Sequence, residues 1–132
     1  MDRPVVAVGE LVAEARAGEL WSPPDDYYPV NVTSVAYESV RVARAGPGRL
    51  YGFTVYNSGA AQFILIFDAN AVPAAGAVPV VAPFAVAATA NIGGYWGSIG
   101  RWFDRGIVIA NSSTGPTYTA GSADCWFDVQ VG

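Results

Sequence analysis

The feature that most constrains this chain is a period-two alternation of apolar side chains, which begins near Val30 and continues to the end of the sequence. In the segment 124–131, for example, Cys125, Phe127 and Val129 stand at every second position. Such alternation is typical of a β-strand that buries one side, because successive side chains point to opposite faces. The sequence therefore predicts that the body of the protein is all-β.

Clusters of glycine, proline and asparagine divide this body into short segments, since these residues mark turns. The turn clusters lie at residues 45–48, 57–60, 91–94 and 111–116. The predicted strands cover residues 31–37, 39–44, 49–57, 62–68, 78–86, 95–103, 106–110 and 124–131. About eight short strands at this spacing predict a single β-sandwich, either jelly-roll-like or immunoglobulin-like. We take a jelly-roll-like sandwich of residues 30–132 as the predicted fold.

The segment 62–68 departs from simple alternation because both of its faces are apolar. Its odd-numbered positions form one apolar face, and Ile64 and Ile66 form the other. A strand of this kind lies in the middle of a sheet, or a neighbouring subunit covers its second face. Ile64 and Ile66 are therefore candidate interface residues. The segment 78–86 is interrupted by prolines, which predicts an edge strand.

Residues 1–29 differ from the body in charge. They contain six acidic and two basic residues, whereas residues 31–132 contain five of each. A segment with this charge imbalance, set apart from the alternating body, predicts an N-terminal arm that lies across another surface.

The arm itself has two parts. Residues 8–20 have a helix-friendly composition, with Leu11 on a weak apolar stripe. The proline-bearing segment 22–29, which contains Tyr27 and Tyr28, predicts an extended or turning chain. We predict an extended or partly helical arm that becomes ordered on a partner or packs on the body. Leu11, Tyr27 and Tyr28 are its candidate interface residues.

The overall composition predicts an apolar surface. Apolar residues make up 52% of the chain and charged residues only 14%, against about 25% charged residues in an average domain. Some apolar surface must therefore be exposed or covered by a partner, which favours self-association. Tyr95, Trp96, Trp102 and Phe103 form the aromatic group that best fits such contacts, and the first three are candidate interface residues. They belong to the core and to subunit contacts, or they stack on sugars.

The residue types that carry most chemistry are scarce. The sequence contains no histidine and a single cysteine, Cys125, which is expected to be a small core residue. Histidine is the commonest general base and a frequent zinc ligand, and no phosphate-binding glycine motif precedes a helix. We therefore expect no enzymatic activity, no cofactor and no metal site. The net charge of −4 without a basic stripe also argues against nucleic-acid binding.

The sequence gives no sign of a membrane segment. Residues 71–90 carry no charge, but the prolines at positions 73, 79 and 83 would break a helix there. The residues that follow Met1 lack the long apolar stretch of a secretory signal. We therefore expect no membrane association.

Across Leu50–Val131 the chain resembles a group of small virion proteins of tailed phages. The recurring order is a strand ending in an Asn turn, a strand ending in Phe-Asp-Ala, a Val-Pro loop and a Gly-Ile-Val-Ile strand. The segments that carry the resemblance are residues 50–59, 61–69, 72–73, the strand around Pro79, 103–111 and 123–131. Residues 1–48 are not covered, and no catalytic motif is among these segments.

The resemblance implies a β-sandwich structural protein, most simply a capsid decoration (cement) protein that clamps neighbouring capsomers. The expected partners are other copies of the chain, as a homotrimer, and the major capsid protein or another virion protein. The expected location is the capsid surface, after assembly in the host cytoplasm. The alternative is a tail or fibre component, or a host-recognition module that binds carbohydrate through Tyr95, Trp96 and Trp102.

Overall fold

The computed structural model describes residues 29–132, which form two antiparallel β-sheets and no helix. The predicted arm, with Leu11, Tyr27 and Tyr28, lies outside the described residues apart from Pro29. The prediction that the body is all-β is confirmed.

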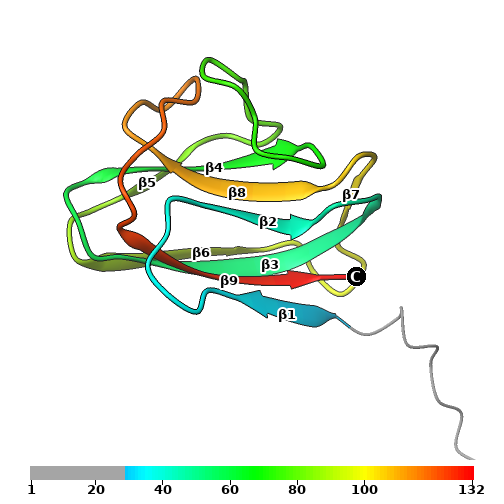
Figure 1. The fold of residues 1–132 in the computed structure, drawn as a ribbon. Coiled ribbons are helices and arrows are strands. Elements are labelled where there is room, and N and C mark those ends of the chain that lie inside the picture. The colour runs from blue at the N-terminus through cyan, green and yellow to red at the C-terminus, as the bar shows by residue number, and fades with distance from the viewer. Residues whose placement is uncertain (1–28) are drawn as a thin grey trace, which may run out of the picture.

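The first sheet has five strands, and Figure 1 shows it as one of two layers. Its spatial order is β1 (Val30–Thr33), β9 (Cys125–Val131), β3 (Gly48–Asn57) and β6 (Ala90–Tyr95). The short β7 (Arg101–Phe103) pairs with the beginning of β3, beyond the end of β6. Most of these neighbours are distant in sequence, so the sheet joins both ends of the described chain.

The second sheet has four strands in the order β2 (Val40–Arg44), β8 (Ile107–Ser112), β4 (Gln62–Asp68) and β5 (Phe84–Val86). Its inner face packs against the inner face of the first sheet. The shared core is apolar and comes from both layers. Its largest fully buried members include Leu50, Val55, Ile64, Ile66, Phe103, Ile107, Ile109, Phe127 and Val129. The two layers therefore form a β-sandwich-like body around one main core.

The outer face of the second sheet is also covered, and the cover comes from the chain itself. Leu65, Phe67 and Val108 form a second buried cluster together with Tyr118 from the loop after β8. Tyr118 exchanges backbone hydrogen bonds with the loop after β4, donating to Ala77 at 2.9 Å and accepting from Gly76 at 2.8 Å. These two long loops lie above the sheet in Figure 1. The apolar face of β4 therefore needs no second subunit to bury it.

This arrangement decides between the two expectations for β4. The strand lies between β8 and β5, so a position inside the sheet is confirmed. Ile64 and Ile66 are fully buried in the core between the sheets, so their assignment to a subunit interface is wrong. The sequence pattern does not separate cover by the chain's own loops from cover by a second subunit, because both would bury the same side chains on the outer face of β4.

The largest local error concerns residues 91–103. Residues 91–94 were expected to form a turn, but they belong to β6, where glycine allows close contact with β3. A Cβ atom on Gly93 would lie 2.7 Å from the Phe53 carbonyl oxygen, and one on Gly94 would lie 2.9 Å from the Phe53 ring. The expected strand 95–103 is instead interrupted by a turn with positive φ at Gly97 and Gly100, and only β7 remains.

Two other predicted strands are shorter in the structure. The first strand ends at Thr33, and Val35 beyond it is 87% exposed. The proline-interrupted segment forms a strand only at Phe84–Val86, which is the edge of its sheet, as predicted.

Candidate functional site

In the part of the chain that the structure describes, no loop covers the outer face of the five-stranded sheet as loops cover the other sheet, and aromatic side chains stand on it. Tyr56 of β3 and Trp126 of β9 are cross-strand partners, so their side chains share this face. Tyr37 extends the row, with its ring edge-on to Trp126 at a centroid distance of 5.5 Å. All three are partly exposed, at 37%, 36% and 48% respectively. Neighbouring exposed aromatic side chains offer flat apolar surface to a partner or a ligand.

A polar strip lies beside the aromatic row on the same face. Thr54 of β3 pairs with Asp128 of β9, which pairs with Thr33 of β1. The Thr33 hydroxyl donates a hydrogen bond to the Asp128 carboxylate at 3.0 Å. Gly93 of β6 lies opposite Thr54 and adds no side chain. The face therefore combines flat apolar rings with hydrogen-bonding groups.

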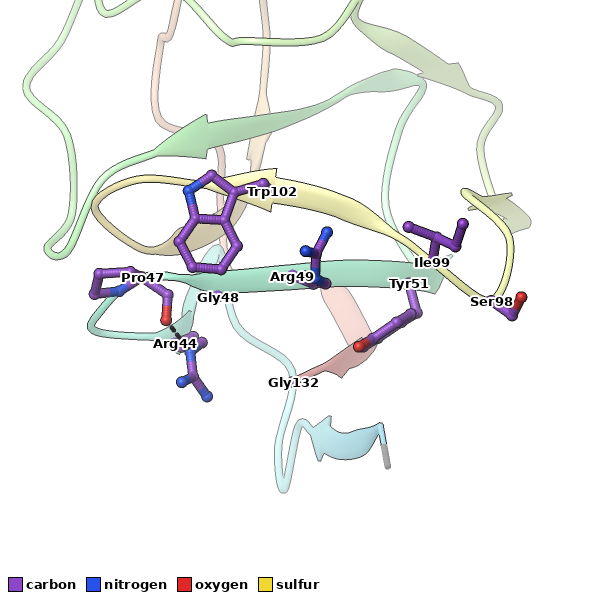
Figure 2. A pocket seen from close by; sticks show the side chains of 9 residues that line it. All are labelled: Arg44, Pro47, Gly48, Arg49, Tyr51, Ser98, Ile99, Trp102 and Gly132. Carbon is purple, nitrogen blue, oxygen red and sulfur yellow. Dashed lines mark hydrogen bonds between the residues drawn. The ribbon is translucent and has the colours of Figure 1, made fainter. Parts of the chain in front are cut away.

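A cavity of about 460 Å³ opens at the β7 end of this face. Figure 2 shows its lining residues, which come from the ends of several strands and from the loop before β7. They are Arg44, Pro47, Gly48, Arg49, Tyr51, Ser98, Ile99, Trp102 and Gly132. Its volume is within the range of about 300–1,000 Å³ that ligand pockets occupy.

Two guanidinium groups give this cavity a positive charge. The guanidinium carbon of Arg49 lies 5.4 Å from the ring centroid of Trp102, a cation–π contact. The Nε atom of Arg44 donates to the Pro47 carbonyl oxygen at 2.7 Å, the bond that Figure 2 draws. We call the cavity the arginine pocket. Its charge and its indole wall suit a carboxylate or a similar anion.

The position of Trp102 depends on the turn that follows β7. Trp102 pairs with Arg49 across the strands, and its indole Nε1 donates to Asp104 at 2.7 Å. The Asp68 carboxylate at the end of β4 holds this turn by accepting backbone N–H groups of Asp104 and Arg105 at 3.2 and 2.8 Å. A side chain of one sheet therefore fixes the edge of the pocket on the other sheet.

The pKa of Asp68 reflects the same contacts. Burial by itself would raise this pKa, but hydrogen bonds from the backbone N–H groups of Arg105, Asp104 and Gly106, together with the Arg105 charge, outweigh it. The pKa of Asp68 therefore lies below its ordinary value of 3.8.

The structure separates the aromatic residues that the sequence grouped together. Tyr95 is 76% exposed and Trp102 is 50% exposed, and both are partners of outward-facing positions on β3. Trp96 instead packs towards the core, with its ring 5.9 Å from that of Phe53 and 6.5 Å from that of Phe84. Trp96 is therefore a support of the core edge, and Tyr95 and Trp102 remain as surface candidates.

Several residues of this face were not among the sequence candidates: Arg44, Arg49, Tyr37, Tyr56 and Trp126. The sequence indicates the outward position of Trp126, because Trp126 lies between Cys125 and Phe127, whose side chains face inward. The arginine pocket had no such signal, because its residues come from segments far apart in the sequence and meet only through strand pairing.

A buried polar cluster lies between the sheets at the opposite end of β3. Asn57, Asn111 and Cys125 are all fully buried, and the Asn111 amide donates to the Cys125 sulfur at 3.4 Å. Burial raises the pKa of the Cys125 thiol, and the Asp124 charge adds to this effect against the opposing Asn111 hydrogen bond. A protonated, enclosed thiol suits packing and not reaction, so the expected core role of Cys125 is confirmed by its burial.

Residues 29–132 contain no group of three or more histidine, cysteine, aspartate or glutamate side chains placed to hold a metal ion. The same residues contain no helix long and apolar enough to cross a membrane. Comparison with models of protein families, with curated proteins and with solved structures found no match. The fold and the open face define the class: a β-sandwich-like protein with an exposed aromatic face.

Proposed function

We propose that this protein is a virion structural protein of a tailed phage or phage-like particle. Its role is that of a capsid decoration protein, which binds as an oligomer across neighbouring capsomers on the particle surface. The resemblance over Leu50–Val131 supports this role, because its segments coincide with β3, β4, β8 and β9. These strands are the inner members of the two sheets.

We also infer that the sandwich is a jelly roll. With β7 set aside, the first, eighth, third and sixth strands in sequence form one sheet, and the second, seventh, fourth and fifth form the other. Jelly rolls, in which two Greek keys wind together, have this order and are frequent in viral capsids and lectins. The order favours the jelly roll over the immunoglobulin-like alternative.

The observation that carries the binding role is the row of Tyr37, Trp126 and Tyr56 on the open face. Tyrosine and tryptophan dominate the energy of protein interfaces, because they bury a large area at a small cost in side-chain entropy. The other sheet already buries its outer face under its own loops. The open face is therefore the surface that supports docking on a particle or on a neighbouring copy.

The test is binding of the purified protein to capsids that lack it. The wild-type protein should saturate discrete positions, and the variant Tyr56→Ala/Trp126→Ala should bind at least about tenfold more weakly, as for the loss of two interface anchors. Val78→Ala, an exposed apolar change on a covering loop, is the matched control. Capsids that gain no density and no stability with the wild-type protein would falsify the proposal.

The oligomeric state is part of the proposal, with a homotrimer as the expected form. A trimer suits local three-fold positions on a capsid and multiplies weak contacts through avidity. Native mass spectrometry of the full chain should give a trimer mass, and a monomer at all concentrations would contradict it.

A second candidate, a glycan-binding module for host recognition, is favoured by the strip of Thr54, Asp128 and Thr33 next to exposed rings. Sugars stack on flat aromatic faces and receive hydrogen bonds from such side chains. Asp128→Ala should abolish glycan binding and leave capsid binding unchanged if this candidate holds. If Asp128→Ala has no effect on any bound glycan, the face serves protein contacts alone.

A further inference from the structure

The two sheets differ in how their edge strands are protected. In the four-stranded sheet, the edge strand β2 carries Arg41 and Arg44 and has an irregular register between Val42 and Arg44. The other edge strand, β5, has only three residues. Charged side chains, bulges and short length are features that keep an edge strand from pairing with another chain. The four-stranded sheet is therefore poorly suited to accept a further strand.

The edge strands of the five-stranded sheet lack charge and irregularity. Neither β1 nor β6 contains a charged residue, and each pairs with its neighbour in an unbroken register. Within residues 29–132 no strand pairs with the outer side of either one, and Figure 1 shows β1 at the margin of its layer. Edges of this kind offer backbone N–H and C=O groups to a further strand.

Exposed apolar side chains extend both edges. After β1 the chain stays beside β9, because the Ser34 and Glu38 N–H groups donate to carbonyl oxygens of Phe127 and Cys125 at 2.8 and 2.9 Å. The exposed side chains are Val30, Val35 and Tyr37 at this edge and Tyr95, Ile99 and Trp102 at the edge formed by β6 and β7.

The area of the two edges is sufficient for a specific contact. These six side chains expose on the order of 800 Å², since an aromatic side chain alone carries about 150–250 Å². The backbone and the polar side chains of two paired strands add to this area. A contact between the two edges therefore reaches the lower end of the range of about 1,200–2,000 Å² that specific interfaces bury.

The strand directions allow the two edges to pair with each other. All neighbours in the order β1-β9-β3-β6 are antiparallel, so β1 and β6 run in opposite directions. A copy rotated about an axis along the strands therefore presents its β1 antiparallel to β6 of the next copy. Such a head-to-tail contact is heterologous, and it forms a ring when the rotation closes.

We propose that β1 of one copy pairs antiparallel with β6 of the next copy, so that the five-stranded sheets of the oligomer join edge to edge in a ring. Another copy is the occupant that fits, because each chain has one edge of each kind and a closed ring covers all of them. The inference rests on the proposed function only for the number of copies, three. The pairing leaves Tyr56 and Trp126 of the inner strands free to contact the particle.

The test is a disulfide trap in the full chain, with the variant Asn31→Cys/Tyr95→Cys. The two positions are level across the sheet, because Asn31 pairs with Gln130, and both Gln130 and Tyr95 pair with Gly52. Opposite residues of antiparallel strands have Cα atoms about 4.5–5.5 Å apart, which a disulfide can bridge. Cys125 is buried and does not compete. Oxidation should give covalent dimers and trimers on non-reducing electrophoresis, and no larger species.

Three variants are the controls. Asn31→Cys and Tyr95→Cys alone should form no covalent oligomer, because the contact joins unlike edges. Asn31→Cys/Asn91→Cys uses the same two edges but moves one cysteine by four residues, about 13 Å along the strand. It should not cross-link, since Cα atoms more than about 7 Å apart cannot be bridged. Circular dichroism checks that each variant is folded.

Three outcomes would overturn the proposal. Covalent dimers of Asn31→Cys alone would show that β1 pairs with β1 of a second copy about a two-fold axis. Covalent species beyond the trimer would show an open filament instead of a ring. A folded Asn31→Cys/Tyr95→Cys variant without any disulfide would show that these edges do not meet, whatever mass native mass spectrometry gives.

The virion role is tested separately on the same material. The cross-linked trimer should bind capsids as the wild-type protein does, because the open face is unchanged. A trimer that forms the disulfides and does not bind capsids would contradict the virion role and leave the edge contact standing.

Discussion

At the scale of single residues, Asn57 is a buried polar side chain with several hydrogen-bond partners. Its amide donates to the carbonyl oxygens of Ala60 and Ala87 at 2.8 and 3.0 Å. Its side-chain oxygen accepts from the Gly59 N–H at 3.0 Å and from the Gln62 amide at 2.8 Å. One fully buried side chain thus holds the turn between β3 and β4 and the chain after β5.

Replacement of Asn57 by alanine should therefore be costly. Asn57→Ala removes these hydrogen bonds and a weak one from the Cys125 thiol at 3.9 Å. It leaves backbone groups without partners, so we expect a loss of about 2–3 kcal/mol in the free energy of unfolding. Urea denaturation measures it. Asn91→Ala, on the exposed side of β6, is the control and should change stability by less than about 0.5 kcal/mol. Equal effects of the two changes would show that the Asn57 network contributes little.

Asp68 predicts a specific response to acid. Its folded pKa is lowered, so its contribution to stability is present above the unfolded value, near 3.8, and is lost as the pH falls through the lower folded value. Asp68→Asn should reduce stability at pH 7 and should flatten the decline below about pH 4. Denaturation midpoints between pH 2 and pH 7 measure both effects. An unchanged acid decline in Asp68→Asn would contradict this prediction.

At the scale of secondary-structure elements, β6 shows how glycine can form a strand instead of a turn. Gly93 and Gly94 let the backbone of β6 lie against β3 where Phe53 turns into the core. Composition alone favours a turn for such residues. The pairing with β3 overrides that preference, because six cross-strand pairs stabilise the strand.

This explanation predicts that β6 does not tolerate a larger residue. Gly93→Ala would place Cβ 2.7 Å from the Phe53 carbonyl oxygen, which is backbone and cannot move aside. We expect a loss of about 1–3 kcal/mol, as for overpacking in a core. Gly46→Ala is the matched control, because no atom lies within 4 Å of its Cβ position. Thermal denaturation of both variants distinguishes a steric cause from the general effect of replacing glycine.

At the scale of the whole molecule, the two sheets use their outer faces differently. The face with Phe67 and Val108 is sealed by loops that include Tyr118, whose ring contacts Phe67 edge-on at 5.4 Å. Within residues 29–132 no loop covers the face with Tyr56 and Trp126. The proposed binding therefore uses the side of the sandwich opposite to the sealed one.

That asymmetry predicts opposite phenotypes for two aromatic truncations. Tyr118→Ala should lower the free energy of unfolding by about 3 kcal/mol, because it leaves a cavity over the second sheet. Trp126→Ala should cost about 1 kcal/mol or less, since the side chain is partly solvated, and should reduce binding instead. Denaturation and capsid binding of both variants separate the two roles. A large stability loss in Trp126→Ala would assign that residue to the core.

Much of this protein is determined by short-range pattern. The alternation in 49–57, 62–68 and 124–131 predicts β3, β4 and β9 within a residue, because each strand has one or two buried faces and period two is visible in sequence. The same alternation turns Cys125 inward and Trp126 outward. The composition, with 14% charged residues, predicts an apolar surface but not its location.

The tertiary structure decided the features that depend on contacts between segments far apart in the sequence. Loops of the chain cover the Leu65 and Phe67 face of β4, and Ile64 and Ile66 face the other sheet in the main core. Strand pairing divided Trp96 from Tyr95 and Trp102. The arginine pocket exists because β3, β7 and the ends of β2 and β9 meet at one edge. Sequence alone determined the strands whose apolar alternation is visible locally, but β6 and the break before β7 depend on pairing with β3. Only the fold determined which faces stay open, because that depends on which distant segments cover them.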